Sequence, residues 1–175
     1  MGEIIVNLRA TPLLLAAALI LSCVRALAAA PPAPTTLNPE WGVVFPDQKA
    51  LELVHQCSRR APRPISGTWT PSAQQIADLD DALLPALMVQ FVQRELSDKG
   101  WQPTDYYRQY GGLIIRGQRI IYVNAFNRYV VEHSKPIDAW KTKAVAICDG
   151  GELVFGVEYD PESKTLSEIQ FNGKP

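Results

Sequence analysis

The cysteines and histidines of this chain are the residues best suited to nucleophilic or metal chemistry, and the sequence holds three of the former and two of the latter. Cys148 begins the segment CDGG between two apolar runs, and Cys57 follows His55 by two residues. A thiol enzyme needs a free cysteine with a histidine beside it to lower the thiol pKa. Residues two apart on a helix point to different faces, so this spacing does not favour a catalytic pair.

Metal and cofactor binding are not expected from the motifs present. The sequence contains no HExxH motif, no paired CxxC, no phosphate-binding glycine loop and no GxSxG. Asp78, Asp80 and Asp81 lie close together but lack the glycine-bearing oxygen loop of calcium sites. We interpret them as a solvated face in the first half of a helix, where negative charge is mildly favourable. No catalytic, cofactor-binding or metal-binding residue is therefore predicted.

The charge balance sets nucleic-acid binding aside. The chain of 175 residues has 17 Lys and Arg against 18 Asp and Glu, without the basic stripe that phosphate backbones require. A hydrophobic share of 47% supports one ordinary folded domain.

Residues 1–28 are predicted to be a secretory signal peptide. Residues 12–24 form an apolar run after Arg9, shorter than the roughly twenty residues of a membrane-spanning helix but suited to a signal h-region. Small residues end it at Ala28, residues 29–40 form an Ala/Pro tether, and a single domain follows at 41–175. The protein is thus expected in the periplasm. Alternatively ILSC, which ends at Cys23, resembles a lipobox, and a lipid on Cys23 would anchor the protein in the outer membrane facing the periplasm.

Cleavage or lipidation consumes Cys23 and leaves two cysteines. Two cysteines in an oxidising compartment usually pair, so we expect a disulfide between Cys57 and Cys148. It would close a loop of about ninety residues and contribute on the order of 4–5 kcal/mol by the chain-entropy estimate. On this interpretation the CDGG segment is a tight turn with a structural cysteine.

Two helices are expected first. Asp47 suits an N-cap, and apolar residues at three- and four-residue steps run from there to Cys57, which would place that cysteine on the core-facing stripe. The prolines of RRAPRPISG, residues 59–67, end this helix and form a connector. A second helix is predicted from Thr70 to Gly100, with a kink or restart at Pro85.

From Tyr106 the apolar period changes to two. Residues 106–126 predict two strands joined at Arg116-Gly117-Gln118, and further strands are expected at 144–148, 152–160 and 165–171. Gly156 lies opposite the apolar face of its strand, which indicates a close approach or a bulge. The predicted fold is α+β: two N-terminal helices packed on a four- to five-stranded antiparallel meander, with one disulfide.

The segment 127–143 interrupts this meander with a connection longer than most hairpin loops. It carries aromatic and basic residues of the kind that dominate protein interfaces. We hypothesise that it contacts a partner protein, with the alternative that its aromatic residues close the edge of the core. The candidate contact residues are Arg128, Tyr129, Trp140, Lys141 and Lys143.

Residues 147–173, ICDGGELVFGVEYDPESKTLSEIQFNG, together with GTWTPSAQQI at 67–76, resemble small exported proteins of Gram-negative bacteria, which mostly have no assigned activity. The order of elements is also similar to cystatin-like and nuclear-transport-factor-like folds. Exported proteins of this size and plan include periplasmic inhibitors and immunity proteins, and the resemblance implies such a role. Fold similarity of this kind does not transfer a function by itself.

The function predicted from the sequence is an exported, non-enzymatic binding protein, an inhibitor or immunity protein that binds another protein. One alternative is a small-ligand or envelope-glycan binding module that uses the concave face of the sheet, and another is a lipid-anchored envelope protein of the same fold. A hydrolase with unidentified carboxylates is the third.

Overall fold

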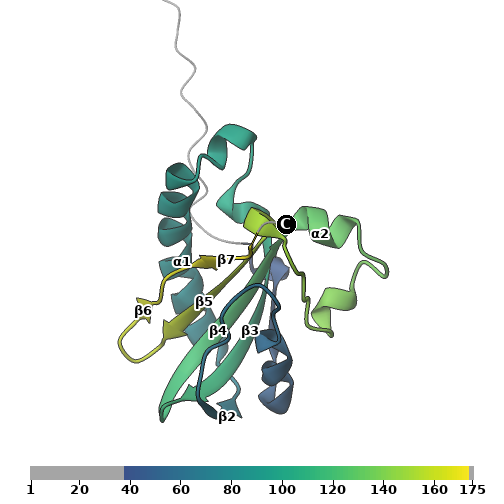
Figure 1. The fold of residues 1–175 in the computed structure, drawn as a ribbon. Helices are drawn as coiled ribbons and strands as arrows, with labels where there is room; N and C mark the ends of the chain where they lie inside the picture. Colours follow the sequence, from purple (N-terminus) through teal and green to yellow (C-terminus); the bar gives the residue numbers. More distant parts are fainter. Residues whose placement is uncertain (1–37, 174–175) are drawn as a thin grey trace, which may run out of the picture. The chain divides into compact units, whose positions relative to one another are not determined.

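A seven-stranded mixed sheet forms the centre of the protein (Figure 1). The computed structural model describes residues 38–173. The strands are β1 (Gly42–Phe45), β2 (Ile65–Trp69), β3 (Tyr106–Ile115), β4 (Gln118–Asn127), β5 (Val154–Asp160), β6 (Thr165–Leu166) and β7 (Gln170–Phe171). The α-helices are α1 (Ala73–Gln93) and α2 (Arg128–Glu132), and the 3-10 helices are η1 (Pro39–Trp41), η2 (Asp47–Val54), η3 (Ser97–Lys99), η4 (Pro103–Asp105), η5 (Ala139–Lys141) and η6 (Gly151–Leu153).

The predicted antiparallel meander is wrong, because the sheet contains a parallel pair. Strand β1 runs parallel to the first half of β3, and β2 runs antiparallel to its second half, so the two short strands follow one another along the same edge. On the other side of β3 the order continues through β4 to β5, and β6 and β7 pair with different parts of β5. The parallel pair is possible because helix α1 and its flanking segments connect β1 and β2 to β3.

The β3–β4 hairpin was predicted correctly. Its strands pair from Tyr106 opposite Asn127 to Ile115 opposite Gln118. The two turn residues, Arg116 and Gly117, have φ values of 52° and 81°. Positive φ at both positions is typical of the tight turn whose twist matches that of paired strands, and glycine adopts it without steric cost.

One long helix covers one face of the sheet, where the sequence predicted a helix with a kink or restart at Pro85. Helix α1 begins after Ser72, whose hydroxyl accepts a hydrogen bond from the Gln75 backbone N–H while the Gln75 side chain accepts one from the Ser72 N–H. The assigned helix continues through Pro85 to Gln93. Its buried face packs on Tyr110, Val123 and other residues of β3, β4 and β5.

The expected first helix is a 3-10 helix that does not carry the cysteine. Helix η2 ends at Val54, three residues before Cys57. Two of its residues, Ala50 and Leu53, lie so close to Gly111 of β3 that a Cβ there would be 2.9 Å from the Ala50 side chain. Gly111 and Tyr110 are neighbours in a strand and point to opposite faces. Helix η2 therefore covers the face of the sheet opposite α1, so the two expected helices lie on opposite faces of the sheet.

The expected strand at residues 144–148 is also absent, although the strand expected at 152–160 is present as β5. The backbone of this segment is hydrogen-bonded by side chains instead of by a neighbouring strand. The Val145 N–H donates to the Gln109 side chain, the Val145 carbonyl accepts from Asn124, and the Ile147 carbonyl accepts from Asn172. The CDGG segment consequently connects this irregular stretch to η6, not two strands.

Within residues 38–173, no helix combines the length and the apolar character that crossing a membrane requires.

Candidate functional site

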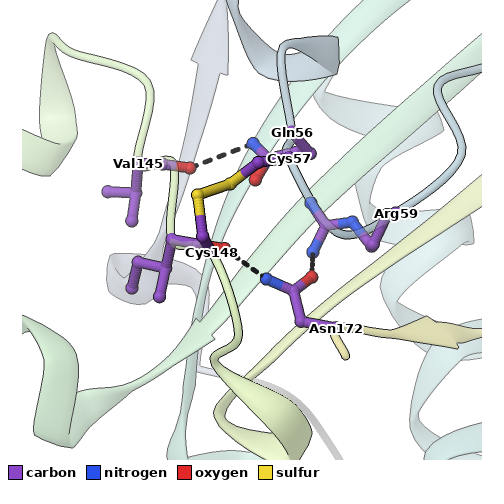
Figure 2. The surroundings of a disulfide bond; sticks show 7 residues. Gln56, Cys57, Arg59, Val145, Cys148 and Asn172 are labelled. Atoms are coloured by element: carbon purple, nitrogen blue, oxygen red, sulfur yellow. Dashed lines mark hydrogen bonds between the residues drawn. A yellow bond between two sulfur atoms is a disulfide. The ribbon is translucent and has the colours of Figure 1, made fainter. Parts of the chain in front are cut away.

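The predicted disulfide is present (Figure 2). Cys57 and Cys148 are joined with their Cα atoms 5.3 Å apart, and both residues are exposed. In the structure the connector runs from residue 55 to residue 64, between η2 and β2, instead of the predicted 59–67. The disulfide attaches this connector to the irregular stretch at 144–148. Gln56 strengthens the same attachment, because its side-chain amide donates to the Val145 carbonyl at 3.1 Å. The connector is thus held in place beside the sheet from one end.

The residues predicted to contact a partner do not all lie on one surface. Arg128 and Tyr129 begin helix α2 and are exposed, and the Arg128 Nε lies 3.8 Å from an Asp105 carboxylate oxygen. Lys141 is exposed, with its Nζ 2.8 Å from Asp138, and Lys143 is exposed as well.

Trp140 differs from the other four because it belongs to the core. Only 5% of its surface is exposed, and it packs with Phe126, Val131 and Val154. Its ring meets the Tyr107 ring edge-on, with the centroids 4.7 Å apart. One of the two aromatic residues of the predicted contact surface is therefore part of the core. The predicted signal peptide, the lipidation site at Cys23 and most of the tether lie outside the described residues.

A buried polar network occupies the middle of the face opposite α1, between two apolar clusters. Gln109 and Asn124, on β3 and β4, are completely buried, and Asn172 is 6% exposed. The Asn124 amide donates to Gln109 Oε1 at 2.9 Å. The fourth member is Arg59, which comes from the connector and is only 8% exposed. Polar groups at this depth normally have hydrogen-bond partners. Here the partners are the other members of the network, the Tyr122 hydroxyl and backbone groups of residues 140–147.

All the hydrogen-bond acceptors of the Arg59 side chain are neutral. Its terminal nitrogens donate to Asn124 Oδ1 at 2.6 Å, to Asn172 Oδ1 at 2.8 Å and to the Tyr122 hydroxyl at 3.3 Å. Its Nε is buried and has no hydrogen-bond partner among the described residues. Burial lowers the pKa of Arg59, partly opposed by Tyr122. That direction reflects a cation removed from water and given no counter-charge.

Gly156 of β5 makes room for this guanidinium. A Cβ at position 156 would lie 2.7 Å from the Tyr122 hydroxyl and 2.9 Å from the Arg59 Nε. The close approach predicted for Gly156 is therefore confirmed, and its cause is the Arg59 side chain, which lies against the strand.

Arg59 lines a cleft of about 820 Å³ between the connector, the β3–β4 turn and the end of β5. Three further arginines line it, Arg60 and Arg63 from the connector and Arg116 from the turn. All three are exposed, and none of them makes an ion pair within residues 38–173. The only carboxylate in the lining is Glu158. Four arginines against one carboxylate make this cleft locally positive in a chain whose net charge is −1.

The pKa of Glu158 is shifted both by burial in the cleft and by the positive charge of a neighbouring arginine. Partial burial raises the pKa of its carboxyl group above the ordinary glutamate value, and the nearby positive charge of Arg116 partly opposes this. Its titration therefore reports on the charge within the cleft.

The described residues offer little for metal or nucleophilic chemistry in this cleft. No group of three or more His, Cys, Asp or Glu side chains that could hold a metal ion occurs within residues 38–173. His55 lies in the cleft lining, whereas His133 stacks on the Tyr129 ring away from it. What the arrangement can do is bind a negatively charged group through several guanidinium donors.

The sequence interpretation missed the arginines of this site. The connector was interpreted only by its prolines, as the end of a helix, although it places three arginines within five residues. The density of arginine, in a chain without net positive charge, was the available signal. Sequence alone could not show that Arg59 is buried against the sheet while Arg60 and Arg63 remain exposed.

Neither the family models nor the curated proteins and solved structures with which we compared the chain gave a match. The site is therefore interpreted from its own chemistry.

Proposed function

We propose that this chain is a non-enzymatic binding protein that acts after export and binds an anionic group in the arginine cleft. The observation that carries the proposal is Arg59, a buried cation whose partners in the described structure are all neutral. A buried charge without a counter-charge is energetically costly, and an anion that enters the cleft would offset that cost.

The geometry around Arg59 favours binding over a purely structural role. Asn124 and Asn172 fix the plane of the guanidinium group, so little conformational entropy is lost when a ligand arrives. Planar guanidinium groups match the oxygens of carboxylate, phosphate and sulfate, and Arg60 and Arg116 add charge at the cleft wall.

The structure also favours ligand binding in the cleft over partner binding through segment 127–143. Of the two aromatic residues expected to contact a partner in segment 127–143, Trp140 is buried and only Tyr129 is exposed. The cleft volume of about 820 Å³ is in the range of small-molecule sites, roughly 300–1,000 Å³. We therefore favour a small-ligand binding protein over an inhibitor or immunity protein.

The test is a titration with inorganic sulfate, at constant ionic strength set with chloride. The protein is expressed from its first residue, purified as the cell processes it, and followed by the NMR signals of the arginine Nε–H groups. Saturable shifts of the Arg59 signal are expected. The double variant Arg60→Gln/Arg116→Gln, which changes only exposed residues, should weaken sulfate binding at least tenfold.

Arg94→Gln is the matched control, because this arginine is exposed and lies over the Phe171 ring, outside the cleft lining. It should leave sulfate binding unchanged. Shifts that do not saturate, or equal losses in the control and the double variant, would refute the proposal.

A further inference from the structure

A second cavity adjoins the arginine cleft and is mostly apolar. It has a volume of about 450 Å³ and shares five lining residues with the cleft, so the two cavities meet along the connector. Its apolar lining residues are Leu51, Val54, Ala61, Pro62, Pro64 and Ile65. They come from η2, the connector and the start of β2. We refer to this cavity as the apolar groove.

The groove leaves apolar side chains partly accessible to solvent beside a positively charged cleft. Leu51 and Ile65 are half-buried, packed on one side against the core cluster around Phe45 and Leu113. Arg63 and His55 line both cavities and mark the boundary between them. A ligand that crosses this boundary meets guanidinium groups at one end and aliphatic side chains at the other.

We infer that the ligand of this protein is an amphiphilic anion, with its charged head in the arginine cleft and an apolar tail in the groove. This inference rests on the proposed function and adds the tail to it. Charge complementarity fixes the head, since four arginines and one carboxylate line the cleft. The apolar lining of a groove that adjoins the cleft fixes the tail.

The head is a phosphate monoester or a carboxylate, because each presents a pair of anionic oxygens that can accept two parallel hydrogen bonds from a guanidinium group. Binding of the tail follows the hydrophobic effect, in which each buried methylene contributes about 0.8 kcal/mol. A ligand with both parts should therefore bind far more tightly than the inorganic anion alone.

The experiment compares three probes on the full-length, cell-processed protein by calorimetry: inorganic sulfate, hexyl sulfate and hexyl glucoside. Hexyl sulfate should bind at least tenfold more tightly than sulfate, which is about 1.4 kcal/mol and corresponds to about two buried methylenes. Hexyl glucoside, which lacks the charge, should bind at least tenfold more weakly than hexyl sulfate. Hexyl phosphate and hexanoate then show which head group the cleft prefers.

Two groove variants separate the tail from the head. Ile65→Thr keeps a β-branched residue in strand β2, and Leu51→Gln keeps the length of the side chain on η2; both residues line the groove and not the cleft. Each variant should weaken the binding of hexyl sulfate severalfold and leave the affinity for inorganic sulfate unchanged. Val92→Thr on α1, at a position 72% exposed, is the matched control and should change neither.

The outcomes distinguish the inference from the function on which it rests. If sulfate and hexyl sulfate bind equally well, the inference that the groove binds an apolar tail is wrong, and the proposed anion-binding function stands. If hexyl glucoside matches hexyl sulfate, the charged head is wrong. If no sulfated probe binds, the proposed function itself fails. An unfolded groove variant leaves the three-probe comparison on the unchanged protein decisive.

Discussion

Two arginines are buried on opposite faces of the same sheet, and they are held in different ways. Arg108, on the α1 face, is 1% exposed, with its Nε 2.6 Å from the Tyr110 hydroxyl and 3.4 Å from an Asp80 carboxylate oxygen. The Tyr110 hydroxyl donates to that same oxygen at 2.6 Å. Arg59, on the other face, is 8% exposed and has only neutral acceptors.

On our proposal, the difference separates an arginine with a structural role from one that binds a ligand. The charge of Arg108 is compensated within the described fold, and its terminal nitrogens also donate to the carbonyls of Tyr106 and Asn38. The charge of Arg59 is not compensated, and its side chain lines a cleft with three exposed arginines. Burial alone therefore does not define a structural role for an arginine; the charge of its partners does.

The largest loss of stability is expected from the variant Arg108→Met. This variant leaves the Asp80 carboxylate, which is 15% exposed, without its cation and should lower the free energy of unfolding by about 3–5 kcal/mol. Arg59→Met, the matched variant on the other face, leaves only neutral acceptors unpaired and should lower it by about 1–3 kcal/mol. Urea unfolding followed by tryptophan fluorescence measures both.

The double variant Arg108→Met/Asp80→Leu checks the cause. Because it removes both charges, it should recover much of the stability lost in Arg108→Met. Equal losses from Arg108→Met and Arg59→Met would mean that the two sites do not differ as described.

The second largest effect is expected from removing the disulfide, which tethers the segment carrying Arg59 but not the strand carrying Arg108. Cys57→Ser/Cys148→Ser releases the connector that carries Arg59 and should lower the free energy of unfolding by about 2–4 kcal/mol. Sulfate affinity should fall as well, because the connector is less ordered, while the NMR signals of Arg108 remain at their positions. Calorimetric unfolding and sulfate titration measure the two consequences. Unchanged sulfate affinity would show that Gln56 and the asparagines position Arg59 without the disulfide.

The smallest effect is the pH dependence of anion binding. Burial raises the pKa of Glu158 in the folded protein, so the native state holds a proton more strongly than the unfolded state does. The contribution of Glu158 to stability is therefore greatest below the ordinary glutamate range and falls as the pH rises through the raised pKa. A bound anion raises this pKa further, and by reciprocity sulfate must bind more tightly below it.

The expected gain in sulfate affinity is less than about fivefold, the size of one partly exposed charge interaction. Sulfate keeps its charge throughout this range, so the dependence reports on the protein. Glu158→Gln should remove the pH dependence and bind sulfate at neutral pH as tightly as the unchanged protein does in acid. A dependence that persists in Glu158→Gln would assign the effect to another group in the cleft.

Local features of the fold could be predicted where neighbours in sequence decide them. The β3–β4 hairpin follows from alternating apolar residues around Arg116-Gly117, and the buried face of α1 follows from its helical period. The Cys57–Cys148 pairing followed from counting cysteines rather than from geometry.

The errors concern residues whose environment depends on distant parts of the chain. Asp80 was interpreted as part of a solvated helix face, yet it is the partner of Arg108. The pattern at 144–148 resembled a strand, but side chains from β3, β4 and the C-terminal segment satisfy its backbone. Burial, pairing and strand neighbours are tertiary properties that periodicity does not encode.

The sequence by itself determined the main helix, the central hairpin, the disulfide and the need for space at Gly156, because periodicity, turn chemistry and the number of cysteines are local or countable properties. Only the tertiary structure decided that β1 pairs in parallel, that both sheet faces are covered, and that Arg59 is buried among neutral partners. Arg59 and Asn172 are 113 residues apart in the chain, and only folding brings the charge of one to the amide of the other.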